Sequence, residues 1–78
     1  MNMHMEKFLI TLIPAEKDGL DVTFVNNFRN VDAATEYARL QLMMACGAYH
    51  EAKIASSWNG SDSCFRQCVD PIVYNNNL

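Results

Sequence analysis

One amphipathic segment, residues 31–47, lies between two stretches that each have the pattern of a β-hairpin. Before it, two alternating apolar segments flank Asp18-Gly19, and after it two more flank Asn59-Gly60. Asp-Gly and Asn-Gly favour tight turns because glycine accepts a positive φ. This order of elements predicts an α+β fold, a four-stranded antiparallel sheet (β-β-α-β-β) with one helix packed on one face.

The four predicted strands span residues 8–13, 22–28, 51–58 and 64–69. The first is largely apolar on both faces, which is typical of a central strand. It ends at Pro14, which has no N–H for a sheet ladder. A two-residue turn at Asn59-Gly60 would pair Ile54 with Phe65, whereas a four-residue loop would shift that register. Residues 72–74 are a candidate for a further short edge strand.

Small and apolar residues recur at helical spacing in residues 31–47, so we expect this face to lie on the sheet. These residues are Ala34, Ala38, Leu42, Ala45 and Tyr49, with Tyr37, Leu40 and Met44 widening the stripe. Asn30 or Asp32 can cap the first turn with a side-chain oxygen. Gly47 predicts the end of the helix, since it can adopt the left-handed conformation after the last turn.

The chain has 78 residues, half of them apolar and 19% charged, as expected of one globular domain. We expect a single compact domain over residues 1–78, with residues 1–5 and 75–78 outside its packed part. One helix and four short strands can cover one core, but they cannot also enclose a deep cleft. A small-molecule enzyme of this size would therefore need a metal or a second subunit to complete its pocket.

The six basic residues are scattered along the chain, and nine acidic residues give a net charge of −3. Binding to a phosphate backbone needs several cations on one face, so direct nucleic-acid binding is not expected. A nucleic-acid mimic would need a dense acidic surface, which dispersed carboxylates do not form. The charge pattern therefore favours neither nucleic-acid binding nor mimicry of nucleic acid.

No segment approaches the ~18–20 apolar residues that span a bilayer, so no membrane partner is expected. The first five residues lack the basic start and apolar run of a signal peptide. Three cysteines are an odd number, whereas small secreted domains usually carry an even disulfide framework. These features predict a cytoplasmic protein with no required disulfide.

The pairs Cys46-x₃-His50 and Cys64-x₃-Cys68 are a candidate Cys₃His zinc site. Their spacing argues against it, because Cys64 and Cys68 would lie roughly 13 Å apart along a strand. The alternative is that the thiols are small, buried or half-buried residues and that His50 is a surface residue at the helix end. We expect no metal and no cofactor, and a small zinc or thiol-metal module is the alternative function.

A Cys–His nucleophile pair would use Cys46 or Cys64 with His50 or His4. No third residue is available to orient the histidine, and no oxyanion site can be recognised. The glycines are isolated and form no phosphate-binding loop. We therefore predict that the protein is not an enzyme, with catalysis at a dimer interface as the alternative.

The helix face opposite the alanine stripe carries residues that a solvated face usually lacks. Glu36, Arg39, Met43, Cys46 and His50 follow one another at helical spacing. The simpler interpretation is a broad core stripe in which methionine fills gaps. The functional interpretation is a partner-binding or homodimer face, because apolar patches rimmed by charge mark such sites. On this interpretation, the partner-binding residues are Glu36, Arg39, Met43 and His50.

Several short segments in this order of elements resemble small proteins encoded by bacteriophages and mobile elements. They are Phe24-Val25, Val31-Asp32-Ala33-Ala34, Tyr37-Ala38 and Ile54. Among such proteins the pattern, which covers about half of the chain, most resembles the compact sheet-plus-helix members of the type I anti-CRISPR proteins. The resemblance implies a non-catalytic inhibitor that occludes a surface of a CRISPR surveillance complex. No motif carries a functional residue over to this chain.

Overall fold

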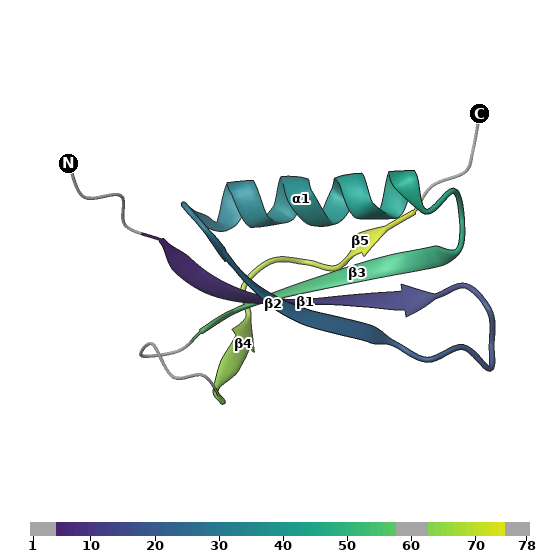
Figure 1. Cartoon of the computed structure of the whole chain (residues 1–78), viewed down its shortest axis with the longest axis horizontal. Helices are drawn as coiled ribbons and strands as arrows, with labels where there is room; N and C mark the ends of the chain where they lie inside the picture. Colours follow the sequence, from purple (N-terminus) through teal and green to yellow (C-terminus); the bar gives the residue numbers. More distant parts are fainter. Residues whose placement is uncertain (1–4, 58–62, 75–78) are drawn as a thin grey trace.

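The computed structural model describes residues 5–57 and 63–74. Its elements are β1 Glu6–Pro14, β2 Val22–Phe28, α1 Val31–Met44, β3 Tyr49–Ser57, β4 Phe65–Gln67 and β5 Ile72–Val73. They form two layers, an antiparallel sheet and one helix that lies along one of its faces (Figure 1). The predicted α+β class and the order of the first five elements are confirmed, and residues 72–73 form the additional edge strand. The expected loose ends, residues 1–4 and 75–78, lie outside the described residues.

The sheet has the order β2-β1-β3-β4, and β5 also pairs with β3. β1 is therefore the central strand, in agreement with its apolar residues on both faces. Since β2 and β3 both run antiparallel to β1, they run parallel to each other. α1 is the crossover that joins them, and this connection holds the helix against one face of the sheet.

β4 and β5 share one side of β3 and together form an interrupted edge. β4 pairs with Ala55–Ser57 of β3, and β5 pairs with Glu51 and Ala52. The strand predicted over residues 64–69 is too long, because β4 spans only Phe65–Gln67 and is followed by a single hydrogen bond from the Cys68 N–H to the Ile54 carbonyl. Ser57, rather than Ile54, lies opposite Phe65, so the register of a two-residue turn is wrong. The turn predicted at Asn59-Gly60 is outside the described residues.

The core is a single cluster between α1 and the sheet. Its buried residues are Phe8, Ile10, Leu12, Ala34, Ala38, Leu42, Ala52 and Ile54. The predicted helix face is confirmed for Ala34, Ala38 and Leu42, whereas Ala45 is half-buried. Alanines at the contact let the helix approach the sheet closely. Phe24 and Phe28 of β2 pack against the Tyr37 ring at centroid distances of 6.1 and 5.2 Å.

The two ends of α1 are set by local chemistry. The Asn30 side chain accepts a hydrogen bond from the Ala33 N–H at 2.9 Å, so Asn30 is the N-cap. The helix ends at Met44, two residues before Cys46, the last helical residue expected if Gly47 follows the last turn. Cys46 and Gly47 follow with φ values of 54° and 92°, and two successive left-handed residues cannot continue a right-handed helix.

The glycine between β1 and β2 has a different role from the one expected. Gly19 does not adopt a positive φ; Gly47 is the positive-φ glycine of the described residues. A side chain at position 19 would instead lie 2.8 Å from the Pro14 ring. The turn therefore needs glycine because its backbone passes close to the end of β1.

Candidate functional site

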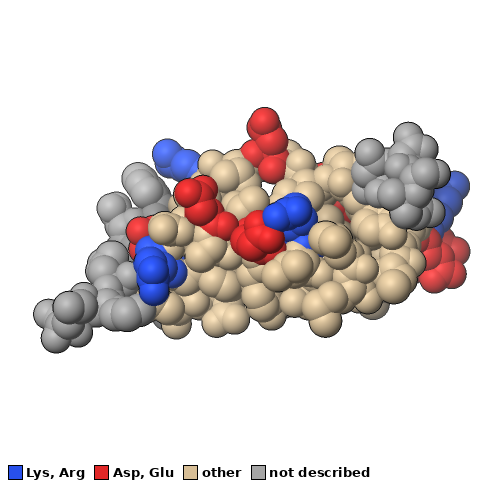
Figure 2. Space-filling view, turned by 90° about the horizontal axis from the view of Figure 1, so that it is seen from above, with Lys and Arg blue, Asp and Glu red and all other residues tan. Residues whose placement is uncertain are grey.

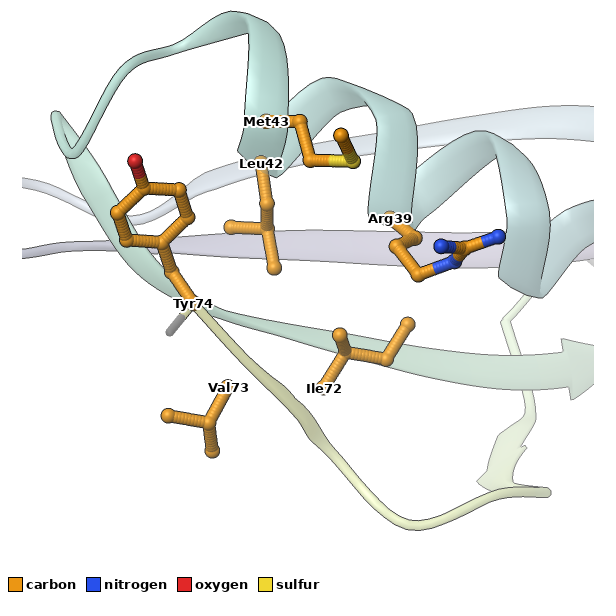
Figure 3. Close-up of a pocket in the computed structure, with 6 residues that line it drawn as sticks. All are labelled: Arg39, Leu42, Met43, Ile72, Val73 and Tyr74. Carbon is orange, nitrogen blue, oxygen red and sulfur yellow. The ribbon is translucent and has the colours of Figure 1, made fainter. Parts of the chain in front are cut away.

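A groove lies between the C-terminal half of α1 and the segment that contains β5. It has a volume of about 240 Å³ and is lined by Arg39, Leu42, Met43, Ile72, Val73 and Tyr74. The first three residues come from the helix and the last three from the end of the described chain (Figure 3). Five of the six are apolar or aromatic, so the groove suits apolar groups with one cation at its rim.

Backbone pairing to β3 holds the second wall of this groove in position. Ile72 and Val73 pair with Ala52 and Glu51, and the Tyr74 N–H donates to the His50 carbonyl at 2.7 Å. These bonds direct the segment alongside the helix, where Ile72 and Tyr74 pack against the core. The wall is thus built from ladder hydrogen bonds and core contacts together.

Met43 and Leu42 are neighbours in sequence with opposite environments. Leu42 is 1% exposed and forms the floor of the groove, whereas Met43 is 55% exposed on its rim (Figure 3). Met44 and Leu40 are also exposed. The interpretation of the wide apolar stripe as core is therefore wrong for these three residues, since one helix face cannot pack all of them on a narrow sheet.

Glu36 and Arg39 form an ion pair on α1, with Arg39 one helical turn before Met43. A guanidinium nitrogen of Arg39 donates to both carboxylate oxygens of Glu36, at 2.6 Å for Oε2. This hydrogen bond and the charge of Glu36 raise the pKa of Arg39 above its usual value. Both side chains are about half exposed, so the pair adds little stability. Its consequence is that the guanidinium is held at the end of the groove.

His50 is not on the helix surface with the other predicted residues. It belongs to β3, and its Nδ1 lies 3.0 Å from the Pro14 carbonyl at the end of β1. Its Nε2 lies 3.7 Å from the Glu51 carboxylate. The predicted helical spacing fails at this point because α1 has already ended. The structure therefore brings Glu36, Arg39 and Met43 together, with His50 outside the lining of the groove.

The β5 wall of the groove is not among the site residues predicted from the sequence. The sequence does contain a signal for this wall, namely the apolar pair that follows Pro71 and the aromatic Tyr74. These residues were predicted only as a short edge strand. Val73 is 65% exposed, an unusual environment for valine. Which element a two-residue strand pairs with depends on tertiary contacts and cannot be recognised from its pattern.

The cysteines and histidines are dispersed among the described residues. No group of three His, Cys, Asp or Glu side chains within residues 5–57 and 63–74 is placed to hold a metal ion. Cys46, Cys64 and Cys68 are free and exposed. No hydrogen bond in this part of the chain joins Cys46 or Cys64 to His50, and His4 is outside it.

Cys68 is the thiol whose environment departs most from that in water. Its Sγ donates to the Ile54 carbonyl at 3.5 Å, next to an open hollow lined by residues 67–70. Partial burial of the thiol raises the pKa of Cys68. A raised pKa lowers the fraction of thiolate, so the environment of Cys68 does not favour nucleophilic chemistry.

The surface on the α1 side carries charges of both signs. Acidic and basic side chains are interspersed over this face, and uncharged residues cover most of it (Figure 2). No helix in the described part of the chain is long and apolar enough to cross a membrane. Comparisons with family models, curated proteins and solved structures gave no match to this chain.

Proposed function

We propose that this protein is a non-catalytic protein-binding module and that the groove between α1 and β5 is its partner-binding site. The observation that carries the proposal is Met43, which is half exposed on the rim of an apolar groove with Arg39 at its end. An apolar anchor beside an arginine is typical of the residues that dominate protein interfaces.

The chemistry of the groove favours a particular kind of partner segment. Leu42, Ile72 and Tyr74 offer an apolar floor and wall for an aliphatic or aromatic side chain. Arg39 can donate a hydrogen bond to a carboxylate or a backbone carbonyl of the partner, although one of its guanidinium nitrogens already donates to Glu36. The segment that fits is therefore apolar with an acceptor group at one end.

The partner we propose is a protein subunit of a host complex, bound in the host cytoplasm by an inhibitor of phage or mobile-element origin. The pattern shared with type I anti-CRISPR proteins supports a CRISPR surveillance complex as that host complex. The interspersed charges support binding to a protein subunit rather than mimicry of nucleic acid.

A matched pair of methionine substitutions tests this proposal. Met43 and Met44 are neighbours on α1 and both are exposed, but only Met43 lines the groove. Met43→Glu should weaken binding to a purified type I surveillance complex by about 100-fold, because a charge would be buried in the interface. Met44→Glu should bind like the wild-type protein.

Thermal melting of both variants accompanies the binding measurement. Met43→Glu should melt within a few degrees of wild type, since the side chain does not belong to the core. Wild-type binding by a folded Met43→Glu variant would exclude the groove. No binding of the wild-type protein to the complex would exclude this partner.

A further inference from the structure

The two edges of the sheet differ in whether a further strand can pair with them. The β4–β5 edge consists of strands of three and two residues, with Pro71 between them. Short edge strands and proline prevent further strands from adding. β2 is a continuous seven-residue strand without proline, glycine or charge, paired with β1 through an uninterrupted register. Among the described residues, no strand pairs with its outer side.

Hydrogen bonds elsewhere in the sheet identify the backbone groups on the outer side of β2. The carbonyls of His50 and Ile54 point towards β5 and β4. The backbone N–H and C=O groups of the odd-numbered residues of β3 therefore point towards β1. Because these groups alternate in direction along a strand, the backbone N–H and C=O groups of Leu9 and Thr11 in β1 point towards β3. Their partners in β2, Val25 and Thr23, consequently direct their N–H and C=O groups outwards.

The backbone groups of Asn27 also point outwards. A hydrogen bond of the Asn27 N–H confirms this direction independently. Its N–H is bonded by the side chain of Asn26 at 2.9 Å rather than by the backbone of β1. This local bond covers a donor that has no strand partner. Thr23, Val25 and Asn27 thus form a row of backbone groups with the geometry of an antiparallel ladder.

The residues that flank β2 carry opposite charges at equal distances from its centre. Asp21 precedes the strand and Arg29 follows it, each four residues from Val25. Both are exposed, and neither forms an ion pair in the described part of the chain. When two such strands pair antiparallel about Val25, Asp21 of each faces Arg29 of the other.

We propose that β2 pairs with β2 of a second copy of this chain, antiparallel and centred on Val25. Val25 faces Val25 of the second copy, and Thr23 faces its Asn27, so the outward groups donate and accept in turn. Asn27 exchanges its bond with Asn26 for one to the second copy. The two-fold axis is perpendicular to the sheet, so one continuous sheet carries both helices on the same face.

The side chains of β2 are compatible with this pairing on both faces of the sheet. On the face without a helix, Val25 lies beside Leu9, so the two copies join their apolar rows. On the helix face, the partly exposed Val22 meets Phe28 of the second copy. The groove between α1 and β5 lies along the opposite edge of each sheet, so both grooves stay accessible, and this inference does not depend on the proposed function.

Charge reversal tests the register. In sedimentation experiments, the wild-type protein should reach about twice the 8.8 kDa mass of one chain. Asp21→Arg alone and Arg29→Asp alone should each weaken the dimer by about tenfold or more, because like charges then face each other twice. The double variant should restore wild-type dimerisation, and an equimolar mixture of the two single variants should form heterodimers.

Proline substitution tests the ladder, with a matched control on the other edge. Val25→Pro removes an outward N–H and should give a folded monomer, whereas Val73→Pro removes an N–H on the β5 edge and should leave the dimer intact. Circular dichroism checks that both variants fold. A wild-type monomer at submillimolar concentration, or single charge-reversal variants that both dimerise with the wild-type dissociation constant, would overturn the proposal. If Val25→Pro does not fold, the charge-reversal set decides alone.

Discussion

Single residues define the end of α1, and Cys46 is the most informative of them. It is a non-glycine residue with φ of 54°, directly followed by Gly47 at 92°. The Cys46 N–H still donates to the Met43 carbonyl, and the Ala48 N–H donates to the Ala45 carbonyl, so the turn is closed by hydrogen bonds. A cysteine therefore occupies a conformation that glycine adopts without steric cost.

This conformation predicts the effect of Cys46→Gly on stability. Relief of the left-handed strain, offset by the greater chain entropy of glycine, should leave the free energy of unfolding unchanged or raise it by up to about 1 kcal/mol. Urea unfolding under reducing conditions measures this change. Because the side chain is exposed, a loss of more than about 1 kcal/mol would assign the thiol a structural role that its contacts do not show.

At the scale of the elements, the hydrophobic pattern predicted most of what the structure contains. The span of β2 was predicted to the residue, and the alanine stripe of α1 identified the buried face. The pattern failed where geometry rather than polarity decides. Ala45 and Cys46 are compatible with a helix in composition, and the register of β4 depends on the length of its connection to β3.

The burial of Leu42 gives the element-scale prediction. Leu42→Ala should lower the free energy of unfolding by about 2–5 kcal/mol, because the side chain is 1% exposed and belongs to the core between α1 and the sheet. Met44→Ala, at a site 73% exposed, should change it by less than about 0.5 kcal/mol. Chemical denaturation of both variants compares them, and equal effects would contradict the assigned helix face.

For the whole molecule, two of the six residues that line the groove were predicted from the sequence as members of the candidate site. Periodicity on α1 identified Arg39 and Met43 as members of one surface. It could not identify Ile72 and Tyr74, because the segment returns to the helix only through pairing with β3. His50 was placed on the same helical surface because a helical period was extended beyond the last helical residue, whereas the structure puts it in β3. The unprotected edge of β2 likewise becomes evident only once the strand order is known.

The proposed dimer predicts how melting depends on concentration. If folded chains associate through β2 and unfolded chains do not, mass action raises the melting temperature with protein concentration. Over a roughly hundredfold range in which the dimer predominates, the gain is about 1.4 kcal/mol per chain, which corresponds to a rise of about 5–10 °C for a domain of this size. Scanning calorimetry measures it. Val25→Pro should melt at a temperature that does not depend on concentration. Arg29→Asp should melt below the wild-type protein at each concentration in this range, because its dimer is weaker, and Val73→Pro should show the wild-type dependence. A wild-type melting temperature that stays constant over this range would contradict association through this edge.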